Sequence, residues 1–409
     1  MDSLVSVIRQ KVFDQIDLSQ EMTDEEIEDL VIAVTAEQVK GKAISLKKRA
    51  QLERQVFHSL RRLDVLQEFV DDPQVTEIMV NGPNHIFYEK NGQVYESDQK
   101  FSSEEKLQDV IQQIVGRHNR VVNQSSPIVD TRLEDGSRVN IVLAPVALDG
   151  AAVSIRKFPE KPFDMQELLK KDSISEEAMN CLRMMVQARY SIFISGGTSS
   201  GKTTFLNALS NYIPKDERII TIEDSAELQI QGISNLVRLE TRNSNVEGLE
   251  EIAIRDLIRS ALRMRPDRII VGECRGPEAF DMLQAMNTGH DGSLSTGHAN
   301  SCKDMLARLE MMVLMGMELP LAAIRQQIVA GIDIIVHLGR IKDRSRRVLD
   351  IMEISGIEDG EIILNPLFHF MELGEKDGKI QGELKKKGRL IHREKLYASG
   401  WKEEDLIGL

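Results

Sequence analysis

Residues 196–203 read Gly-Gly-Thr-Ser-Ser-Gly-Lys-Thr, and this stretch decides the fold class of the chain. It matches the phosphate-binding pattern GxxxxGK[ST] at every position, between an apolar run at 191–195 and a helix-forming run at 204–209. Glycine lets backbone amides turn towards a polyphosphate, and the N-terminus of the following helix favours the same negative charge. The sequence therefore predicts a strand, a phosphate loop and a helix within an α/β domain.

The side chains of this loop fit the chemistry of phosphate binding. Lys202 would neutralise the β- and γ-phosphates, and the hydroxyl of Thr203 would bind Mg²⁺. The residues that we expect to contact the nucleotide are Gly196, Gly197, Thr198, Ser199, Ser200, Gly201, Lys202, Thr203 and Thr204.

Acidic residues follow two other apolar runs. Glu223 and Asp224 come after residues 219–222, and Glu273 comes after residues 269–272. Carboxylates at the carboxyl ends of parallel strands face the ligand crevice of an open α/β sheet. Hydrolysis needs one acid to hold Mg²⁺ and one group to orient water. We expect Thr203, Glu273 and Asp224 to be the metal ligands and Glu223 to share the catalytic work, although the sequence does not decide which glutamate orients water.

A stretch of small residues at 288–300 carries two of the eight histidines, His290 and His298. These histidines are candidates for reading the state of a phosphate or for placing a carboxylate. A zinc site is the competing interpretation. It fails because Cys302 is accompanied by no second cysteine and no HxxxH pattern.

Composition bounds the remaining possibilities. The chain has 409 residues, enough for two or three domains, and 65 acids against 52 bases give it a formal charge of −13. This charge and an aromatic content of 4% argue against a general nucleic-acid binder. Three scattered cysteines favour a reducing cytoplasm. Because the longest apolar stretch, residues 139–148, is far below the ~20 residues of a membrane-spanning helix, we expect any membrane role to depend on a partner.

The pattern along the chain predicts three sections and a linker. Residues 1–70 are expected to be helical, with a capping box at Thr23–Glu26 and a basic helix from about residue 46 to 70. The basic face of that helix indicates either a solvated surface or docking to an acidic partner. Residues 71–157 read as an α/β domain, residues 158–163 as a linker, and residues 164–409 as helices alternating with buried strands. Five methionines between residues 305 and 317 indicate adaptable core packing, with an intersubunit or partner surface as the alternative.

Four motifs taken in order resemble the secretion ATPase superfamily of type II secretion, type IV pili and type IV secretion. They are the Walker A loop at 196–204, the acidic box TIEDSAEL at 221–228, the Walker B strand RIIVGECRG at 268–276 and the histidine box TGHDGSLSTGHANS at 288–301. The resemblance implies ATP hydrolysis with Mg²⁺. It also implies a RecA-like P-loop domain, preceded by a smaller α/β N-terminal domain and a helical N-terminal extension.

One branch of that superfamily fits the N-terminal half. The stretches VDTRLEDGSRVN at 129–140, SIRKF at 154–158 and MVNG at 79–82 are similar to the CpaF-type ATPases of tight-adherence (Tad) pili. The chain lacks the tetracysteine zinc module of pilus-extension and type II secretion ATPases, and its N-terminal part is longer than that of retraction-type ATPases. Both departures favour the Tad branch.

The resemblance also implies partners and further site residues. Arg132, Arg138 and Arg156 would reach phosphates from the N-terminal domain, partly across a subunit boundary. The motor would be a cytoplasmic homo-hexamer, peripheral to the inner membrane, docked on a platform protein to assemble or retract a pilus. A conjugation-type secretion ATPase that moves protein or DNA and a regulatory module with little hydrolysis remain as alternatives, and a nucleic-acid motor is disfavoured.

Overall fold

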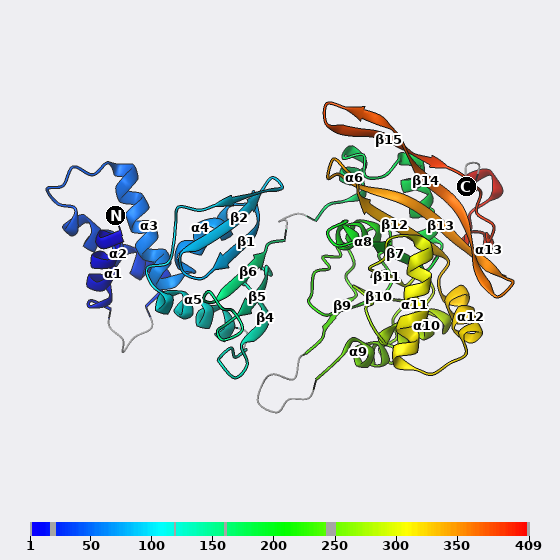
Figure 1. Cartoon of the computed structure of the whole chain (residues 1–409), viewed down its shortest axis with the longest axis horizontal. Coiled ribbons are helices and arrows are strands. Elements are labelled where there is room, and N and C mark those ends of the chain that lie inside the picture. The colour runs from blue at the N-terminus through cyan, green and yellow to red at the C-terminus, as the bar shows by residue number, and fades with distance from the viewer. Residues whose placement is uncertain (1, 17–21, 118–119, 159–161, 243–250, 407–409) are drawn as a thin grey trace. The chain divides into compact units, whose positions relative to one another are not determined.

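The computed structural model describes residues 2–16, 22–117, 120–158, 162–242 and 251–406. They form two compact units, which we call the N-terminal unit, up to residue 160, and the C-terminal unit, from residue 161 (Figure 1). Each unit has its own sheet and its own hydrophobic core. Within the described ranges, no helix has both the length and the hydrophobicity needed to cross a membrane.

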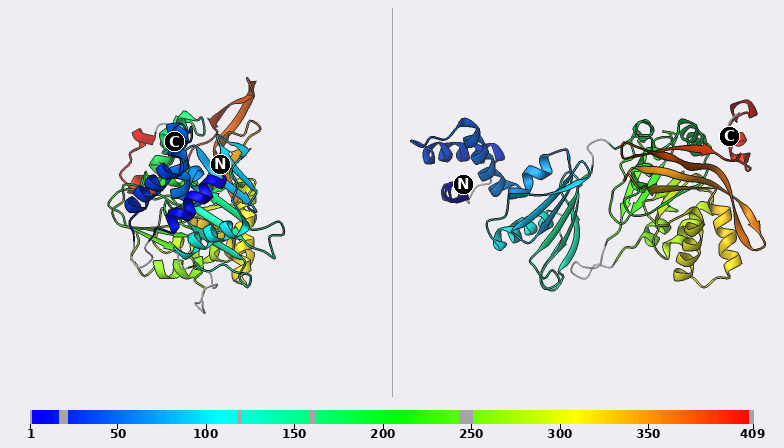
Figure 2. Two further views of the ribbon diagram at one scale, coloured as in Figure 1. Left: turned by 90° about the vertical axis from the view of Figure 1, so that its left-hand side faces the viewer. Right: turned by 45° about the horizontal axis from the view of Figure 1, so that its top comes forward.

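The N-terminal unit begins with three helices, α1 (Asp2–Phe13), α2 (Asp24–Gln38) and α3 (Leu46–Arg61), which share a small core of their own. The right-hand view of Figure 2 shows them as a group beside the sheet of this unit. The expected capping box is confirmed, because the Glu26 amide donates to Thr23 Oγ1 and the Thr23 amide donates to the Glu26 carboxylate. The expected helix over 46–70 is wrong in its length. It ends at Arg61, and η1 (Asp64–Leu66) and α4 (Gln67–Asp71) follow, because Leu63 and Leu66 turn into the core of the sheet.

The sheet of the N-terminal unit has six antiparallel strands in the order β3-β2-β1-β6-β5-β4. The hairpin expected near residues 86–92 is confirmed as β2 and β3. Helix α5 (Glu104–Gly116) packs its apolar side against one face of the sheet. The strands are β1 (Val75–Asn81), β2 (His85–Lys90), β3 (Gln93–Glu96), β4 (Ile128–Arg132), β5 (Arg138–Val142) and β6 (Ala152–Arg156).

The C-terminal unit is built on nine strands in the order β15-β14-β13-β12-β7-β11-β10-β8-β9. The strands from β12 to β9 in this order are parallel, and β13, β14 and β15 add antiparallel strands beyond β12. The strands are β7 (Ile192–Gly196), β8 (Ile219–Glu223), β9 (Leu236–Glu240), β10 (Arg268–Val271), β11 (Leu294–Gly297), β12 (Ile334–Arg340), β13 (Arg346–Glu358), β14 (Glu361–Lys376) and β15 (Lys379–Lys386). The α/β class predicted from the sequence is confirmed.

Helices cover both faces of this sheet, and successive residues of β7 alternate between the two cores: Ile192 and Ile194 face one, and Phe193 faces the other. The first face carries α6 (Met165–Lys170), α7 (Glu176–Gln187), α8 (Lys202–Ser210) and α13 (Glu394–Ala398), and η2 (Glu403–Leu406) follows α13. The second face carries α9 (Ile254–Ala261), α10 (Glu278–Asn287), α11 (Cys302–Gly316) and α12 (Leu321–Gly331).

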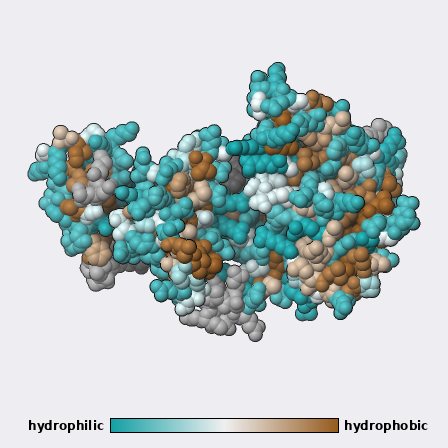
Figure 3. Space-filling view, viewed as in Figure 1, coloured by the Kyte–Doolittle hydropathy of each residue, from teal (hydrophilic) through white to brown (hydrophobic). Residues whose placement is uncertain are grey.

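The methionine-rich segment is only partly core. Met305 and Met312 are buried on α11, but Met311 and Met315 are each 65% exposed. The core-packing interpretation is therefore wrong for the outer methionines, because α11 turns only one of its sides towards the sheet. Hydrophobic residues accordingly gather on the surface of the C-terminal unit over α11 and α12 (Figure 3).

Candidate active site

Four neighbouring parallel strands bring the sequence motifs to one edge of the C-terminal sheet. Strands β7, β11, β10 and β8 are adjacent, so whatever follows their carboxyl ends meets at that edge. The phosphate loop follows β7, His298 follows β11, and Glu273 follows β10 after Gly272. Glu223 is the last residue of β8.

The phosphate loop has a backbone that its sequence requires. Gly201 has a φ of 95°, which glycine adopts without strain. At Gly196, a Cβ atom would lie 2.5 Å from the Leu338 carbonyl oxygen. The buried Lys202 side chain donates to the Gly197 carbonyl at 3.1 Å, and Arg346 Nε donates to the Ser199 carbonyl at 3.0 Å. The loop is thus fixed by contacts with β13 and with its own lysine, and it packs closely on β12.

A chain of polar contacts joins this loop to the acidic residues. Lys202 Nζ lies 3.3 Å from His298 Nδ1, and His298 Nε2 lies 2.7 Å from Glu273 Oε1. Arg275 Nη2 donates to Glu273 Oε2 at 2.6 Å, and Arg275 Nη1 lies 3.8 Å from Asp224 Oδ2. Segments that follow four strands, β7, β11, β10 and β8, therefore supply five side chains that contact one another in turn at the sheet edge.

The protonation state of His298 suits this chain of contacts. Burial lowers the pKa of His298, and the positive charge of Lys202 acts in the same direction against the opposing effect of Glu273. A neutral imidazole can accept from Lys202 at Nδ1, and its Nε2 lies 2.7 Å from Glu273 Oε1. The ring can therefore respond to a change in charge on either side.

Glu223 occupies a buried position behind this chain. Its side chain is 3% exposed, and its Oε1 accepts from the amides of Glu227 and Leu228, both at 2.8 Å. Its Oε2 is buried and has no hydrogen-bond partner in the part of the chain that the structure describes. Burial raises the pKa of Glu223 to about 7. The residue packs so closely on Gly272 that a Cβ atom there would lie 2.8 Å from Glu223 Cγ, so glycine before Glu273 makes room for this carboxylate.

The oxygen donors at this edge fit a magnesium ion, which prefers hard oxygen ligands and retains several waters. Thr203 lies in the first turn of α8, and the side chains of Glu273 and Asp224 are 19% and 47% exposed. The unpartnered Oε2 of Glu223 adds an acceptor for a bound water. Thr203, Glu273 and Asp224 are the residues that would hold the ion.

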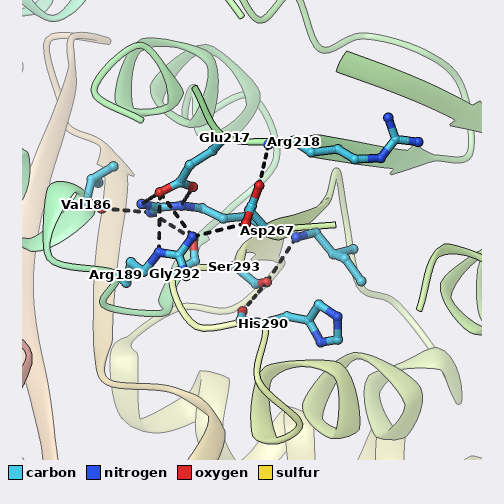
Figure 4. Close-up of polar contacts among 10 residues, drawn as sticks. Val186, Arg189, Glu217, Arg218, Asp267, His290, Gly292 and Ser293 are labelled. Atoms are coloured by element: carbon cyan, nitrogen blue, oxygen red, sulfur yellow. Dashed lines mark hydrogen bonds and ion pairs between the residues drawn. The ribbon is translucent and has the colours of Figure 1, made fainter. Parts of the chain in front are cut away.

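His290 lies elsewhere. It precedes β11, at the amino end of the strand, whereas the phosphate loop follows the carboxyl end of parallel β7. Its ring contacts the Ala285 carbonyl at 3.1 Å. Figure 4 shows it beside Ser293, whose Oγ donates to the His290 carbonyl at 2.7 Å. The fully buried Arg268, which begins β10, donates to Glu217 at 2.5 and 3.0 Å. Within one C-terminal unit, the structure does not bring His290 to Lys202.

The N-terminal unit aligns its three candidate arginines. Arg132 of β4 pairs with Arg138 of β5, and Arg138 pairs with Arg156 of β6, so the three form one row across adjacent strands. Their strand neighbours Val139 and Ile155 are buried, so the row lies on the face opposite α5. Like charges directly opposite one another destabilise a sheet. Glu77 of β1 lies opposite Arg156 in the same row and offsets part of this repulsion.

Two features of the site were missed by the sequence analysis. Arg275 stands two residues after Glu273 in the Walker B stretch, a position that could have drawn attention to it. The other feature is a cavity of about 320 Å³ beside the phosphate loop, assembled from distant segments that no local pattern connects. Its lining includes Phe163, Leu168, Gly201, Phe205, Leu338 and Arg346.

Residues 60–355 match the family model of type II/IV secretion system proteins. The chain belongs to this family. The secretion ATPase is 34% identical over 293 residues to a putative conjugal transfer protein of Mycobacterium tuberculosis, a match that covers 70% of this chain and 83% of the relative. It is 32% identical over 322 residues to the type IV secretion system protein PtlH of Bordetella pertussis, with coverage of 72% and 95%.

Solved structures agree with the fold of the secretion ATPase. The Legionella pneumophila ATPase DotB superposes with a TM-score of 0.53 at 22% identity, covering 72% of this chain and 80% of that one. The pilus retraction motor PilT with bound ADP gives a TM-score of 0.51 at 20% identity, covering 74% and 81%. The predictions of an ATPase and of this superfamily are therefore confirmed, and nucleotide binding follows from the family.

Proposed function

We propose that this secretion ATPase is a homo-hexameric motor that powers assembly or retraction of a Tad-type pilus. It would work in the cytoplasm, docked on a platform protein of the inner membrane. The N-terminal stretches similar to CpaF-type ATPases support this branch. The observation that carries the motor chemistry is the contact chain from Lys202 through His298 and Glu273 to Arg275.

The phosphates of ATP would bind the loop amides and Lys202, with the base in the adjoining cavity of about 320 Å³. Thr203, Glu273 and Asp224 would hold Mg²⁺, which would neutralise charge on the phosphates. Glu273 is the best placed group to orient the attacking water, because it also touches His298, which contacts the phosphate-binding lysine. Glu223, which is buried and has a raised pKa, would hold a second water.

His298 would report the charge of the bound phosphate to Glu273, because it touches both Lys202 and Glu273. His290 needs a different role. Since it precedes β11 and His298 follows the same strand, His290 would influence the phosphate only through movement of β11.

The row formed by Arg132, Arg138 and Arg156 supports assembly of the subunits into a ring. We propose that Arg132, Arg138 and Arg156 act on phosphates bound by another subunit, where an arginine contributes ~10³–10⁵ in turnover. Mixing two inactive variants tests this arrangement. Lys202→Ala subunits retain the arginines, and Arg138→Ala subunits retain the phosphate loop, so their mixture should recover turnover that neither variant has alone. A mixture as inactive as its components would refute a site shared between subunits.

The biological role requires a test in cells that make such a pilus. With Lys202→Ala at the chromosomal locus and normal protein levels, surface pili counted by electron microscopy should disappear. Retained pili with loss of exported protein or transferred DNA would instead support a conjugation-type motor. That second candidate is favoured by the relatives, which include a putative conjugal transfer protein and a type IV secretion protein.

A further inference from the structure

An acid-free basic segment interrupts an otherwise acidic chain. Between Glu37 and Glu53 there is no Asp or Glu, whereas the sequence as a whole has 65 acids against 52 bases. The cations of this segment are Lys40, Lys42, Lys47, Lys48 and Arg49. Such a local excess needs an explanation that the ATPase site does not provide, because the segment belongs to α2, α3 and the turn between them.

The structure distinguishes the cations of this segment that face solvent from those that form ion pairs within the N-terminal unit. Arg61 and Arg62 at the end of α3 bind Asp24 at 3.1 and 2.7 Å, and so tie α3 to the start of α2. Arg49 pairs with Glu53 at 2.8 Å. In contrast, Lys40, Lys42, Lys47 and Lys48 are all exposed, and none pairs with a residue that the structure describes.

The four lysines gather at the free end of the α2–α3 hairpin. Helix α3 has 16 residues and is therefore about 24 Å long. Its C-terminal end leads into η1 and the sheet of the N-terminal unit, so its N-terminal end is the distal one. Figure 1 shows the turn between α2 and α3 pointing away from that sheet. We call residues 39–48 the hairpin tip.

The hairpin tip is ordered and carries an apolar residue at its outermost helix turn. Ser45 caps α3 by accepting from the Lys48 amide at 3.3 Å, and the Lys42 amide donates to the Val39 carbonyl at 2.9 Å. Leu46 is 85% exposed, directly beside Lys47. Lysines around one protruding leucine combine the two elements that surface-bound proteins use on anionic lipid: charge attraction and shallow apolar insertion.

We propose that the hairpin tip binds the surface of an anionic lipid bilayer directly. Each lysine near an anionic leaflet strengthens binding about five-fold. Screening over ~8–10 Å limits the opposing repulsion to acids close to the tip, such as Glu37 in the last turn of α2. Insertion of Leu46 adds the second attachment that stable peripheral binding requires. This contact is independent of the partner-mediated docking proposed above, and it does not rest on the nucleotide site.

The test is flotation of the full chain with vesicles of phosphatidylglycerol and phosphatidylcholine at 30:70, against vesicles of phosphatidylcholine alone. Binding should require the anionic lipid and should weaken steeply between 50 and 500 mM salt. Lys47→Ala with Lys48→Ala should weaken it about 25-fold, and Leu46→Ser should weaken it at least five-fold. ATP turnover without vesicles, which these exposed residues do not touch, shows that each variant is folded.

The matched control removes the same charge from another exposed site, with Lys376→Ala and Lys379→Ala on the β14–β15 hairpin. This control should bind vesicles as the wild type does. An equal loss of vesicle binding in the control would overturn the proposal, because binding would then depend on the net charge of the protein and not on the hairpin tip. Equal binding to both vesicle types, or no binding, would also overturn it, and would leave the hairpin tip as a surface for an acidic protein.

Discussion

Replacing Gly272 by alanine separates the placement of Glu223 from the binding of nucleotide. The new Cβ would lie 2.8 Å from Glu223 Cγ and 3.3 Å from Glu223 Oε1. Since carbon atoms in contact settle near 3.5–4.0 Å, the carboxylate must move by roughly 0.7 Å or more. It cannot move freely, because its Oε1 is held by the amides of Glu227 and Leu228. Misplacement of about 1 Å costs up to ~10² in rate.

We therefore expect Gly272→Ala to lower kcat by about 10- to 100-fold and to leave the Kd for ATP within about three-fold, because Lys202 and α8 keep their contacts. Phosphate release and isothermal titration calorimetry measure the two quantities. Gly116→Ala is the matched control, since nothing lies within 4 Å of its added Cβ. In a Glu223→Ala background the clash is relieved, so Gly272→Ala should have little further effect. Wild-type turnover in Gly272→Ala, or fully additive losses in the double variant, would refute the reasoning.

Three further predictions concern the charged groups. Arg275→Ala should lower kcat about ten-fold with little change in KM, and Arg275→Lys should recover part of the loss; steady-state kinetics that show a KM effect alone would contradict this. Burial raises the pKa of Glu223 from 4.5 to about 7. Between pH 5 and 8, Glu223 therefore loses its proton at a lower pH in the unfolded chain than in the folded one, and the wild type becomes less stable as the pH rises. Glu223→Gln should thus gain about 2–3 kcal/mol over the wild type across that range in urea unfolding, and a constant difference would exclude the raised pKa. Arg138→Ala should reduce turnover about 10³-fold while ATP binding changes little, and equal losses in calorimetry and phosphate release would assign Arg138 a binding role.

The sequence predicted the phosphate loop and the order of motifs because both depend on local rules. The stretch from Gly196 to Thr203 must turn tightly before a helix, and the spacing of its glycines indicates this turn in the sequence. Strands β8 and β10 were predicted from their apolar runs. In contrast, β11 contains only Leu294-Ser-Thr-Gly, and its fully buried place between β7 and β10 comes from neighbouring strands rather than from its own pattern.

Long-range contacts explain what the sequence could not supply. The cavity beside the loop joins Phe163 to Leu338, residues that are far apart in the chain. The sequence does not distinguish the two histidines of the histidine box. In the structure His290 precedes β11 and His298 follows it, so they lie at opposite edges of the sheet. A basic face on α3 was visible, but only the ion pairs of Arg61 and Arg62 with Asp24 distinguish internal from outward-facing cations.

The central claim is that Glu273, which follows β10, is needed for hydrolysis more than for nucleotide binding. Phosphate release and ATP affinity of Glu273→Gln, measured beside the wild type, test it most directly. The Kd should stay within about three-fold, while turnover should fall by at least ~100-fold, as expected when the group that orients water is removed. Turnover within three-fold of the wild type, or a loss of ATP binding as large as the loss of turnover, would contradict the claim.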